Sequence, residues 1–185
     1  WQSGQAQEAK KAGDAGARLT PPDIKVGDRV QFQSSVVGTM VTGNDGLDYA
    51  VIRFDPAKVQ PVSNWKGFII NGIGPDPTFG EIACKLGRTT GYSCGVTWGP
   101  GQDPGTIVNQ VCGQPGDSGA PVTVNNKLVG MIHGAFSDDL PTCVVKFIPL
   151  HTPAVAMSIN TQLADIVAKS RPGSGFVPVG SAPAV

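Results

Sequence analysis

The sequence lacks an excess of charge of either sign and lacks any long apolar run. Lys and Arg total 14, Asp and Glu total 14, and the formal net charge is zero. This balance argues against nucleic-acid binding and against attraction to an anionic membrane surface, because both need a concentrated basic patch. No apolar stretch approaches the roughly 20 residues that a membrane-spanning helix requires. The 185-residue chain is therefore expected to bury a core, in one large domain or two small ones.

Histidine is scarce, and the chain begins without methionine. The two histidines, His133 and His151, have no cysteine nearby in the sequence, and the cysteine spacing is unlike that of a usual zinc site. We therefore expect no metal and no cofactor. The first residue is Trp1, with no signal peptide before it, which predicts a processed, cleaved or truncated product.

Four cysteines predict a disulfide framework in a secreted protein. The sequence alone permits three connectivities. Nesting favours Cys84 with Cys94, across a hairpin, and Cys112 with Cys143. Each bond would contribute about 2–4 kcal/mol, mainly by restricting the unfolded chain. The alternative is four buried free thiols.

Glycine and proline are abundant, at 25 and 16 residues, which is typical of many short strands joined by turns. The strand-like runs are 29–33, 36–42, 49–54, 67–71, 81–85, 95–98, 106–111, 121–124, 128–133 and 144–148. One amphipathic helix is predicted over 158–168, with Ser158 or Asn160 as its N-cap. The sequence therefore predicts an all-β fold with a helix near its C-terminal end.

The stretch GQPGDSGAPV, residues 113–122, places one serine among three glycines. Glycines let the backbone turn sharply enough to aim bare N–H groups at a reacting oxygen, which predicts that Ser118 is a nucleophile on a tight turn. A serine hydroxyl is a weak nucleophile until a base takes its proton. This prediction therefore requires a base elsewhere in the protein.

Three segments, VCGQPGDSGAPV, ACKLGRTTGYSCGVTW and SSVVGTMVTGNDGLDYAVIRF, resemble successive parts of the chymotrypsin-like serine peptidases. The GRTTGY hairpin between two cysteines resembles the bacterial branch that contains α-lytic protease and the streptogrisins. The resemblance covers roughly residues 24–170. It implies two packed antiparallel barrels, each of six strands, with the active site in the cleft between them and a helix at the C-terminus.

The resemblance also implies a division of the chain into five segments. These are 1–23, a surface helix or an inserted loop; 24–78, a first barrel; 79–157, a second barrel with the nucleophile loop; 158–170, the helix; and 171–185, a disordered tail.

By the same resemblance, Ser118 is the nucleophile and Asp48 is the acid that orients the catalytic histidine. The backbone N–H groups of Gly116 and Ser118 would form the oxyanion hole. Asp117 would be buried beneath this loop, where a carboxylate without a cation is costly, and Arg88 of the hairpin is its expected partner.

The matched segments also imply a pocket for the substrate residue before the scissile bond. No acidic residue falls at the base of this pocket, so an apolar side chain is the expected preference, and His133 at the rim is the one feature that would favour an acidic side chain. The expected lining residues are Gly113, Gln114, Pro115, Ile132, His133, Gly134, Ala135, Val144, Val145 and Lys146.

The sequence departs from the family in the residue that would serve as the catalytic general base. The family places a catalytic histidine before the acid, whereas no histidine precedes Asp48. His133 matches the strand that lies beneath the acid, and His151 is expected to be structural or exposed. About three strands fit before the acid's strand ends, which leaves the first barrel incomplete. We therefore expect a preceding segment, outside this chain, that carries two strands and the histidine.

Two functions remain open from the sequence. The first is a secreted serine endopeptidase that cleaves polypeptides through an acyl-enzyme on Ser118, with this chain alone nearly inactive because its base is missing. The second is a non-catalytic pseudoprotease that serves as a binding or regulatory module. An unrelated β-rich secreted domain is a third, more distant reading.

Overall fold

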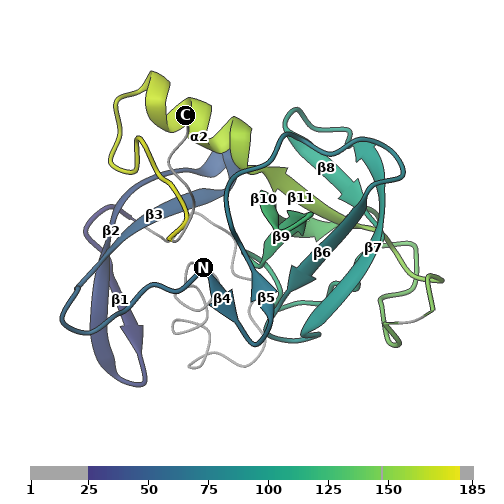
Figure 1. The fold of residues 1–185 in the computed structure, drawn as a ribbon, viewed down its shortest axis with the longest axis horizontal. Coiled ribbons are helices and arrows are strands. Elements are labelled where there is room, and N and C mark those ends of the chain that lie inside the picture. Colours follow the sequence, from purple (N-terminus) through teal and green to yellow (C-terminus); the bar gives the residue numbers. More distant parts are fainter. Residues whose placement is uncertain (1–24, 147, 180–185) are drawn as a thin grey trace.

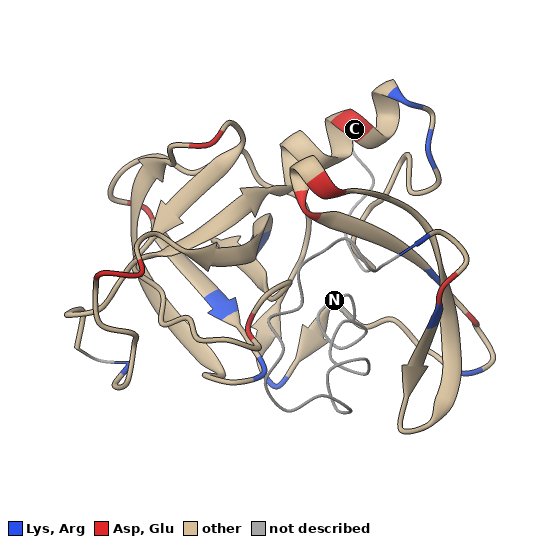
Figure 2. Ribbon diagram, turned by 180° about the vertical axis from the view of Figure 1, so that it is seen from behind, with Lys and Arg blue, Asp and Glu red and all other residues tan. Residues whose placement is uncertain are grey.

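The structure is a computed structural model that describes residues 25–146 and 148–179. The described residues form a closed barrel, a small open sheet, a two-stranded hairpin and one α-helix, in the arrangement shown in Figure 1. Basic and acidic residues are scattered over both the barrel and the open sheet (Figure 2). Among the described residues, no helix is long and apolar enough to cross a bilayer.

The closed barrel is the larger unit and forms the second barrel that the sequence predicted. Its six strands neighbour one another in the order β10-β11-β8-β7-β6-β9, and all the pairs are antiparallel. Their bounds are β6 Ile82–Leu86, β7 Tyr92–Pro100, β8 Thr106–Asn109, β9 Pro121–Val124, β10 Lys127–Ala135 and β11 Ala154–Ser158.

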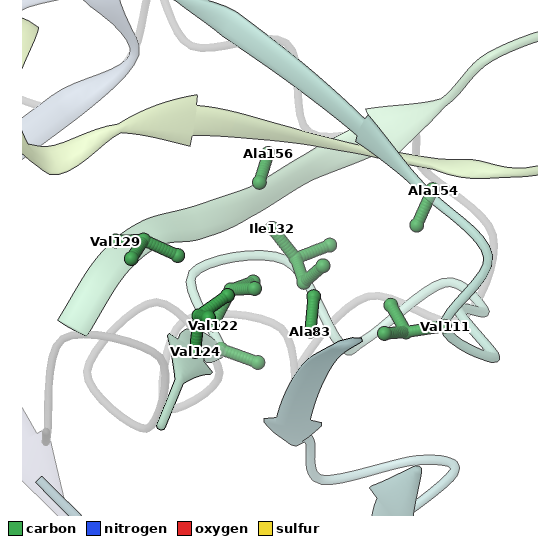
Figure 3. Packing of buried hydrophobic residues seen from close by; sticks show 9 residues of the cluster. Ala83, Val111, Val122, Val124, Val129, Ile132, Ala154 and Ala156 are labelled. Carbon is green, nitrogen blue, oxygen red and sulfur yellow. The ribbon is translucent and has the colours of Figure 1, made fainter. Parts of the chain in front are cut away.

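Small and β-branched side chains fill the barrel interior (Figure 3). Alternating residues of a strand point to opposite faces, so β9 contributes Val122 and Val124 to this core, and β11 contributes Ala154 and Ala156. The most deeply buried members are Ala83, Val111 and Ala156, each with no exposed surface, and Val122 and Val129 at 1%. A rigid barrel therefore supports the loop between β8 and β9, which carries Ser118.

The open sheet stands where the sequence predicted an incomplete first barrel. Strands β1 Arg29–Phe32, β2 Ser35–Asn44 and β3 Tyr49–Phe54 pair in the order β1-β2-β3, and the short strands β4 Asn64–Trp65 and β5 Phe68–Ile69 form a separate hairpin. Among the described residues this half does not close into a barrel, and β1 and β3 each pair on one side only. The prediction of an incomplete first barrel is confirmed.

Helix α2, Ile159–Ala168, confirms the predicted helix and packs against β10 and β11. Ser158 caps it, because its side chain accepts a hydrogen bond from the Thr161 N–H. Ile159, Gln162 and Ile166 form its buried face. The helix lies at the junction between the barrel and the open sheet (Figure 1).

One predicted strand is wrong. The sequence favoured a strand over 144–148, but residues 144–146 and 148 lie outside any strand, and Val144 is 84% exposed. The barrel instead closes through β11, which pairs with both β8 and β10 and buries Ala154, Ala156 and Met157. Strand propensity depends on packing context, and here the run Ala154–Ser158 pairs with the barrel strands.

The structure describes only part of the two segments that were predicted at the ends of the chain. The predicted surface helix or inserted loop, 1–23, lies outside the described residues. The predicted disordered tail, 171–185, is described as far as residue 179. Arg171 donates to the Gly43 carbonyl at 2.7 Å, and residues 176–179 line an apolar groove discussed below. The start of this segment therefore contacts the open sheet.

Both predicted disulfides are present. Cys84 is bonded to Cys94 across the β6–β7 hairpin, and Cys112 is bonded to Cys143. The second bond ties the start of the Ser118 loop to the segment that leads toward β11.

Candidate active site

The loop that carries Ser118 is a pair of tight turns built on glycines. Gly116 and Gly119 have φ angles of 100° and 80°, in the left-handed region that side chains with a Cβ rarely adopt. The Asp117 N–H donates to the Gln114 carbonyl at 3.0 Å, and the Ala120 N–H donates to the Asp117 carbonyl at 2.9 Å. The loop therefore turns on both sides of Ser118, as the sequence predicted.

The two N–H groups predicted to form an oxyanion hole belong to Gly116 and Ser118. Within the described part of the chain, neither the Gly116 N–H nor the Ser118 N–H donates a hydrogen bond. Because most backbone N–H groups in folded proteins are paired, two unpaired donors on one turn are available to an external oxygen.

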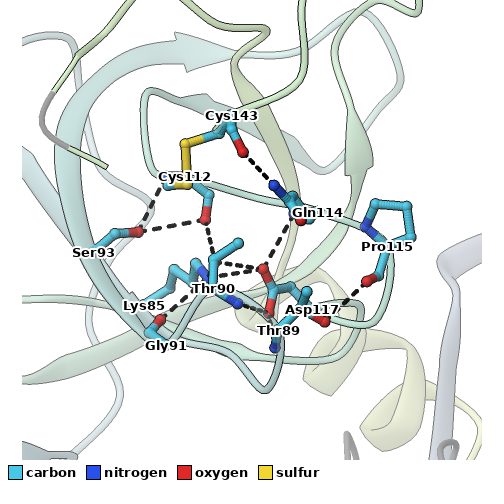
Figure 4. A network of polar contacts seen from close by, with 10 residues as sticks. All are labelled: Lys85, Thr89, Thr90, Gly91, Ser93, Cys112, Gln114, Pro115, Asp117 and Cys143. Carbon is cyan, nitrogen blue, oxygen red and sulfur yellow. Dashed lines mark hydrogen bonds and ion pairs between the residues drawn. A yellow bond between two sulfur atoms is a disulfide. The ribbon is translucent and has the colours of Figure 1, made fainter. Parts of the chain in front are cut away.

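The Asp117 carboxylate anchors this loop from below and is 1% exposed (Figure 4). Its Oδ1 accepts from the N–H groups of Thr89 and Thr90 at 2.8 and 3.2 Å. Its Oδ2 accepts from the Gln114 N–H at 3.2 Å and lies 2.6 Å from the Thr90 hydroxyl. Several donors thus satisfy the buried carboxylate, which fixes the residue next to Ser118.

The charged partner of Asp117 is Lys85, which corrects our expectation of Arg88. The Lys85 Nζ lies 3.0 Å from Asp117 Oδ2, and neither side chain has any exposed surface. A Cβ at Gly87 would stand 2.2 Å from Asp117 Oδ1, so the first glycine of the GRTTGY segment leaves room for the carboxylate. The motif therefore supplies backbone donors and space, while the preceding strand supplies the cation.

Burial and pairing shift the pKa values of Lys85 and Asp117 in opposite directions. Burial lowers the pKa of the Lys85 ammonium, and the Asp117 carboxylate offsets only part of that effect. Burial alone would raise the pKa of Asp117, but the hydrogen bonds from Thr90 and the Lys85 charge outweigh it and hold that pKa below its usual value. Asp117 is therefore the charged group around which the loop is organised.

Asp48 lies in a turn that helix α2 holds in place. It follows the 3-10 turn Asp45–Leu47 and has a φ of 45°, which aspartate tolerates better than most residues. Gln162 of α2 donates to the Leu47 carbonyl at 3.0 Å. The Tyr49 hydroxyl donates to Asp165 of α2 at 2.7 Å. Residues on both sides of Asp48 are thus tied to the helix.

His133 contacts Asp48 directly. Its Nδ1 lies 2.6 Å from Asp48 Oδ2, and the two side chains are 42% and 30% exposed. The hydrogen bond to Asp48 raises the pKa of His133, although partial burial opposes this effect. The sequence placed His133 on a strand beneath the acid and assigned it to the pocket wall. The structure adds a direct polar contact between His133 Nδ1 and the candidate acid.

His151 is a structural histidine, which is one of the two roles expected from the sequence. It is 7% exposed, and its Nδ1 lies 2.8 Å from the Thr152 carbonyl. Gln110 also donates to the His151 carbonyl at 2.9 Å. These contacts hold the segment before β11 rather than a reacting group.

The predicted pocket residues fall into two neighbouring segments. The Cys112–Cys143 bond and a hydrogen bond from the Gln114 side chain to the Cys143 carbonyl join 113–115 to 144–146. Val145 is 45% exposed, whereas Ile132 is 5% exposed and belongs to the barrel core. The Ile132 side chain packs in that core and also borders the small cavity next to Asp48.

A separate apolar groove of about 360 Å³ runs between the open sheet and the barrel. Strand β3 forms one wall through residues such as Ile52 and Phe54, and helix α2 contributes Leu163 and Ile166. A smaller cavity of about 40 Å³ lies against Asp48, Gly119 and Ile132.

No family model matches this chain, and no curated protein matches it by sequence. Solved structures do resemble it. Cellulomonas bogoriensis chymotrypsin aligns at 22% identity over 78% of this chain and 79% of that one, with a TM-score of 0.58. Thermobifida fusca protease A aligns at 22% identity over 78% of this chain and 77% of that one, with a TM-score of 0.57. A glutamic-acid-specific serine protease, described as using a histidine triad in substrate binding, aligns at 18% identity over 72% and 73%, with a TM-score of 0.57.

These likenesses define the class of fold. The chain has a chymotrypsin-like fold, with one complete barrel, a partial second one and a C-terminal helix. The structures that resemble it are bacterial chymotrypsin-like proteases, as the sequence motifs predicted.

Proposed function

We propose that this chain is the larger part of a serine endopeptidase that cleaves polypeptides through an acyl-enzyme on Ser118. The observation that carries the proposal is the glycine turn anchored by Asp117, which holds Ser118 beside two unpaired N–H groups. The protease fold of the structural neighbours supports it.

The proposed reaction assigns each group one task. A base takes the Ser118 proton, and the Ser118 oxygen attacks the peptide carbonyl. The N–H groups of Gly116 and Ser118 stabilise the oxyanion, and one such donor is typically worth about 3 kcal/mol in the transition state. The protonated base then gives its proton to the leaving amine, and water releases the acyl group by the same steps in reverse. Asp48 orients the base.

We propose that the base histidine for peptide cleavage lies on a segment outside this chain. Two features of the open half support this view. Strands β1 and β3 each pair on one side only within the described part of the chain, and unpaired edges are ready to accept further strands. The apolar groove between sheet and barrel offers a surface that such strands would cover.

The compartment and the substrate are further parts of the proposal. Two disulfides favour an oxidising, extracytoplasmic location.

An apolar residue before the scissile bond remains the expected substrate preference. The neighbour specific for glutamic acid uses histidines to bind substrate, but here the ring of His133 is engaged by Asp48. That contact argues against its serving as a specificity group.

The alternative is a non-catalytic binding module on the same fold. Its support is the contact of His133 Nδ1 with Asp48 Oδ2, which occupies one of the two oxygens of the candidate acid.

The test compares the natural material with the 185-residue chain alone. Natural material is first treated with a fluorophosphonate and then separated on a reducing denaturing gel. It should show a second short polypeptide and labelling at Ser118. The same material should hydrolyse peptides at least about 1,000-fold faster than the 185-residue chain alone. The Ser118→Ala protein should show neither reaction. Natural material that consists of this single chain and has no peptidase activity would support the binding module.

A further inference from the structure

We propose that Asn109 determines which substrate residue is bound before the scissile bond, and that this residue is glutamine. The inference rests on the proposed function, because it assigns a substrate class to the same site. It refines the expected apolar preference. The stem of the substrate side chain remains apolar, and its end carries a neutral hydrogen-bonding group.

The first support is a cluster of unpartnered polar atoms inside the closed barrel. Asn109 and Thr97 each have no exposed surface. Within the described part of the chain, Asn109 Nδ2, Asn109 Oδ1 and Thr97 Oγ1 have no hydrogen-bond partner. Buried polar groups are nearly always hydrogen-bonded, because a buried donor or acceptor without a partner costs free energy. These unused donors and acceptors therefore indicate a group that binds beside them.

Strand pairing places the two side chains together and turns them toward the barrel interior. Asn109 of β8 is opposite Thr97 of β7 on one side and opposite Ala154 of β11 on the other. Residues that are opposite each other in an antiparallel pair point to the same face of the sheet. Ala154 belongs to the barrel core (Figure 3), so Asn109 and Thr97 also point inward.

The same row of residues leads to the predicted substrate pocket. Ala154 is opposite Ala135 of β10, which is one of the expected lining residues. A Cβ at Gly113, another expected lining residue, would stand 3.5 Å from the Ala154 Cβ. A Cβ at Gly134 would have no atom of the described residues within 4 Å. In this row only the small side chain of Ala154 separates the pocket residue Ala135 from Asn109.

A carboxamide complements Asn109 better than a charged or a purely apolar group does. The Asn109 amide presents a donor, Nδ2, and an acceptor, Oδ1. The glutamine side chain carries the matching acceptor and donor at its end, beyond an apolar stem. An ionised glutamate only accepts hydrogen bonds, so it would leave the Asn109 oxygen unpartnered, and its charge is costly to bury. A leucine side chain would leave both Asn109 groups unpartnered.

The experiment measures peptide binding to the 185-residue chain, so that the result does not depend on catalysis. The probes are three acetylated tripeptides with a free C-terminal carboxylate, Ala-Ala-Gln, Ala-Ala-Leu and Ala-Ala-Glu. Chemical-shift titrations give their dissociation constants. The glutamine peptide should bind about 10-fold more tightly than either of the others, because it gains two hydrogen bonds to groups that otherwise have no partner.

Variants assign this preference to Asn109. Asn109→Leu should abolish the advantage of the glutamine peptide and leave binding of the leucine peptide unchanged or tighter. Asn64→Leu, the same change at an exposed residue of β4, should keep the preference of the parent chain. Should Asn109→Leu fail to fold, the comparison of the three peptides on the parent chain still tests the inference.

Three results would overturn the inference: equal binding of the three peptides, tighter binding of the leucine peptide, or no binding of any peptide. Asn109 and Thr97 would then hold internal water only. The proposed function fails by a different observation, namely natural material that leaves Ser118 unlabelled and cleaves no peptide. If such material still binds the glutamine peptide more tightly, the inference stands for a binding module.

Discussion

At the scale of single residues, the buried pair of Lys85 and Asp117 is the feature on which the nucleophile loop depends. Neither side chain has exposed surface, and their charged atoms lie 3.0 Å apart. A buried ion pair contributes little net stability compared with apolar residues of the same shape, but removal of one partner leaves an uncompensated charge. The pair is therefore a fragile point next to Ser118.

We expect Lys85→Met to destabilise the fold by about 3–5 kcal/mol, because Asp117 would remain buried without its cation. Denaturant unfolding measures this loss. Lys127→Met, the same change at an exposed lysine of β10, should stay within about 0.5 kcal/mol. Lys85→Met combined with Asp117→Asn should recover a large part of the loss. A cost below about 1 kcal/mol for the single Lys85→Met change would contradict this view of the pair.

The sequence predicted the acid of this pair and missed its cation. Asp117 belongs to a local motif whose glycines have a clear conformational purpose, so its burial could be foreseen. The choice between Lys85 and Arg88 could not, because both residues lie near the same hairpin. Lys85 is completely buried in β6, and strand alternation at this position sends its side chain inward.

At the scale of elements, helix α2 holds the open sheet and the turn of Asp48 in place. Its residues reach Leu47 and Tyr49, on either side of that acid, and its apolar face lines the groove. Asp165 accepts from Tyr49 and Asn44 and pairs with Lys169, and these contacts hold its pKa well below the usual range. The helix therefore links the two halves of the candidate site.

Ile166→Ala should cost about 2–5 kcal/mol, because Ile166 is 5% exposed and its removal opens a cavity. Val167→Ala, one position along the same helix, is the matched control. Val167 is 57% exposed, so its truncation should change the free energy of unfolding by no more than about 0.5 kcal/mol. Equal effects of the two changes in denaturant unfolding would show that α2 does not pack as described.

Elements with a strong local pattern were predicted well. The strands at 49–54 and 121–124 and the helix near 159 match the structure closely, because their apolar spacing and flanking turn residues agree. The closing strand β11 was missed, and a strand over 144–148 was predicted in its place. Both runs are apolar, and which one enters the barrel depends on its pairing with β8 and β10, which lie elsewhere in the sequence.

At the scale of the whole molecule, two disulfides brace the complete barrel, while the open sheet has none among the described residues. The Cys112–Cys143 bond closes a sequence separation of 31 residues, against 10 for Cys84–Cys94. A longer loop restricts the unfolded chain more, so the two bonds should differ in the stability that they add.

Replacing Cys112 and Cys143 together by alanine should cost about 1 kcal/mol more than replacing Cys84 and Cys94 together, by the loop-length dependence of chain entropy. Both double variants keep the other bond intact and serve as controls for each other. Chemical unfolding under non-reducing conditions gives the comparison. A larger loss from the Cys84 and Cys94 variant would show that loop length does not govern the difference.

The sequence by itself determined the features that are encoded locally: the glycine turn around Ser118, the hairpin that binds Asp117, the amphipathic helix and the chymotrypsin-like class of fold. Only the tertiary structure decided which distant side chains meet. His133 and Asp48 are 85 residues apart in sequence, and their contact exists because the open sheet packs beside the barrel. Backbone preferences act between near neighbours, whereas such contacts depend on how whole elements are placed, and no short motif records that placement.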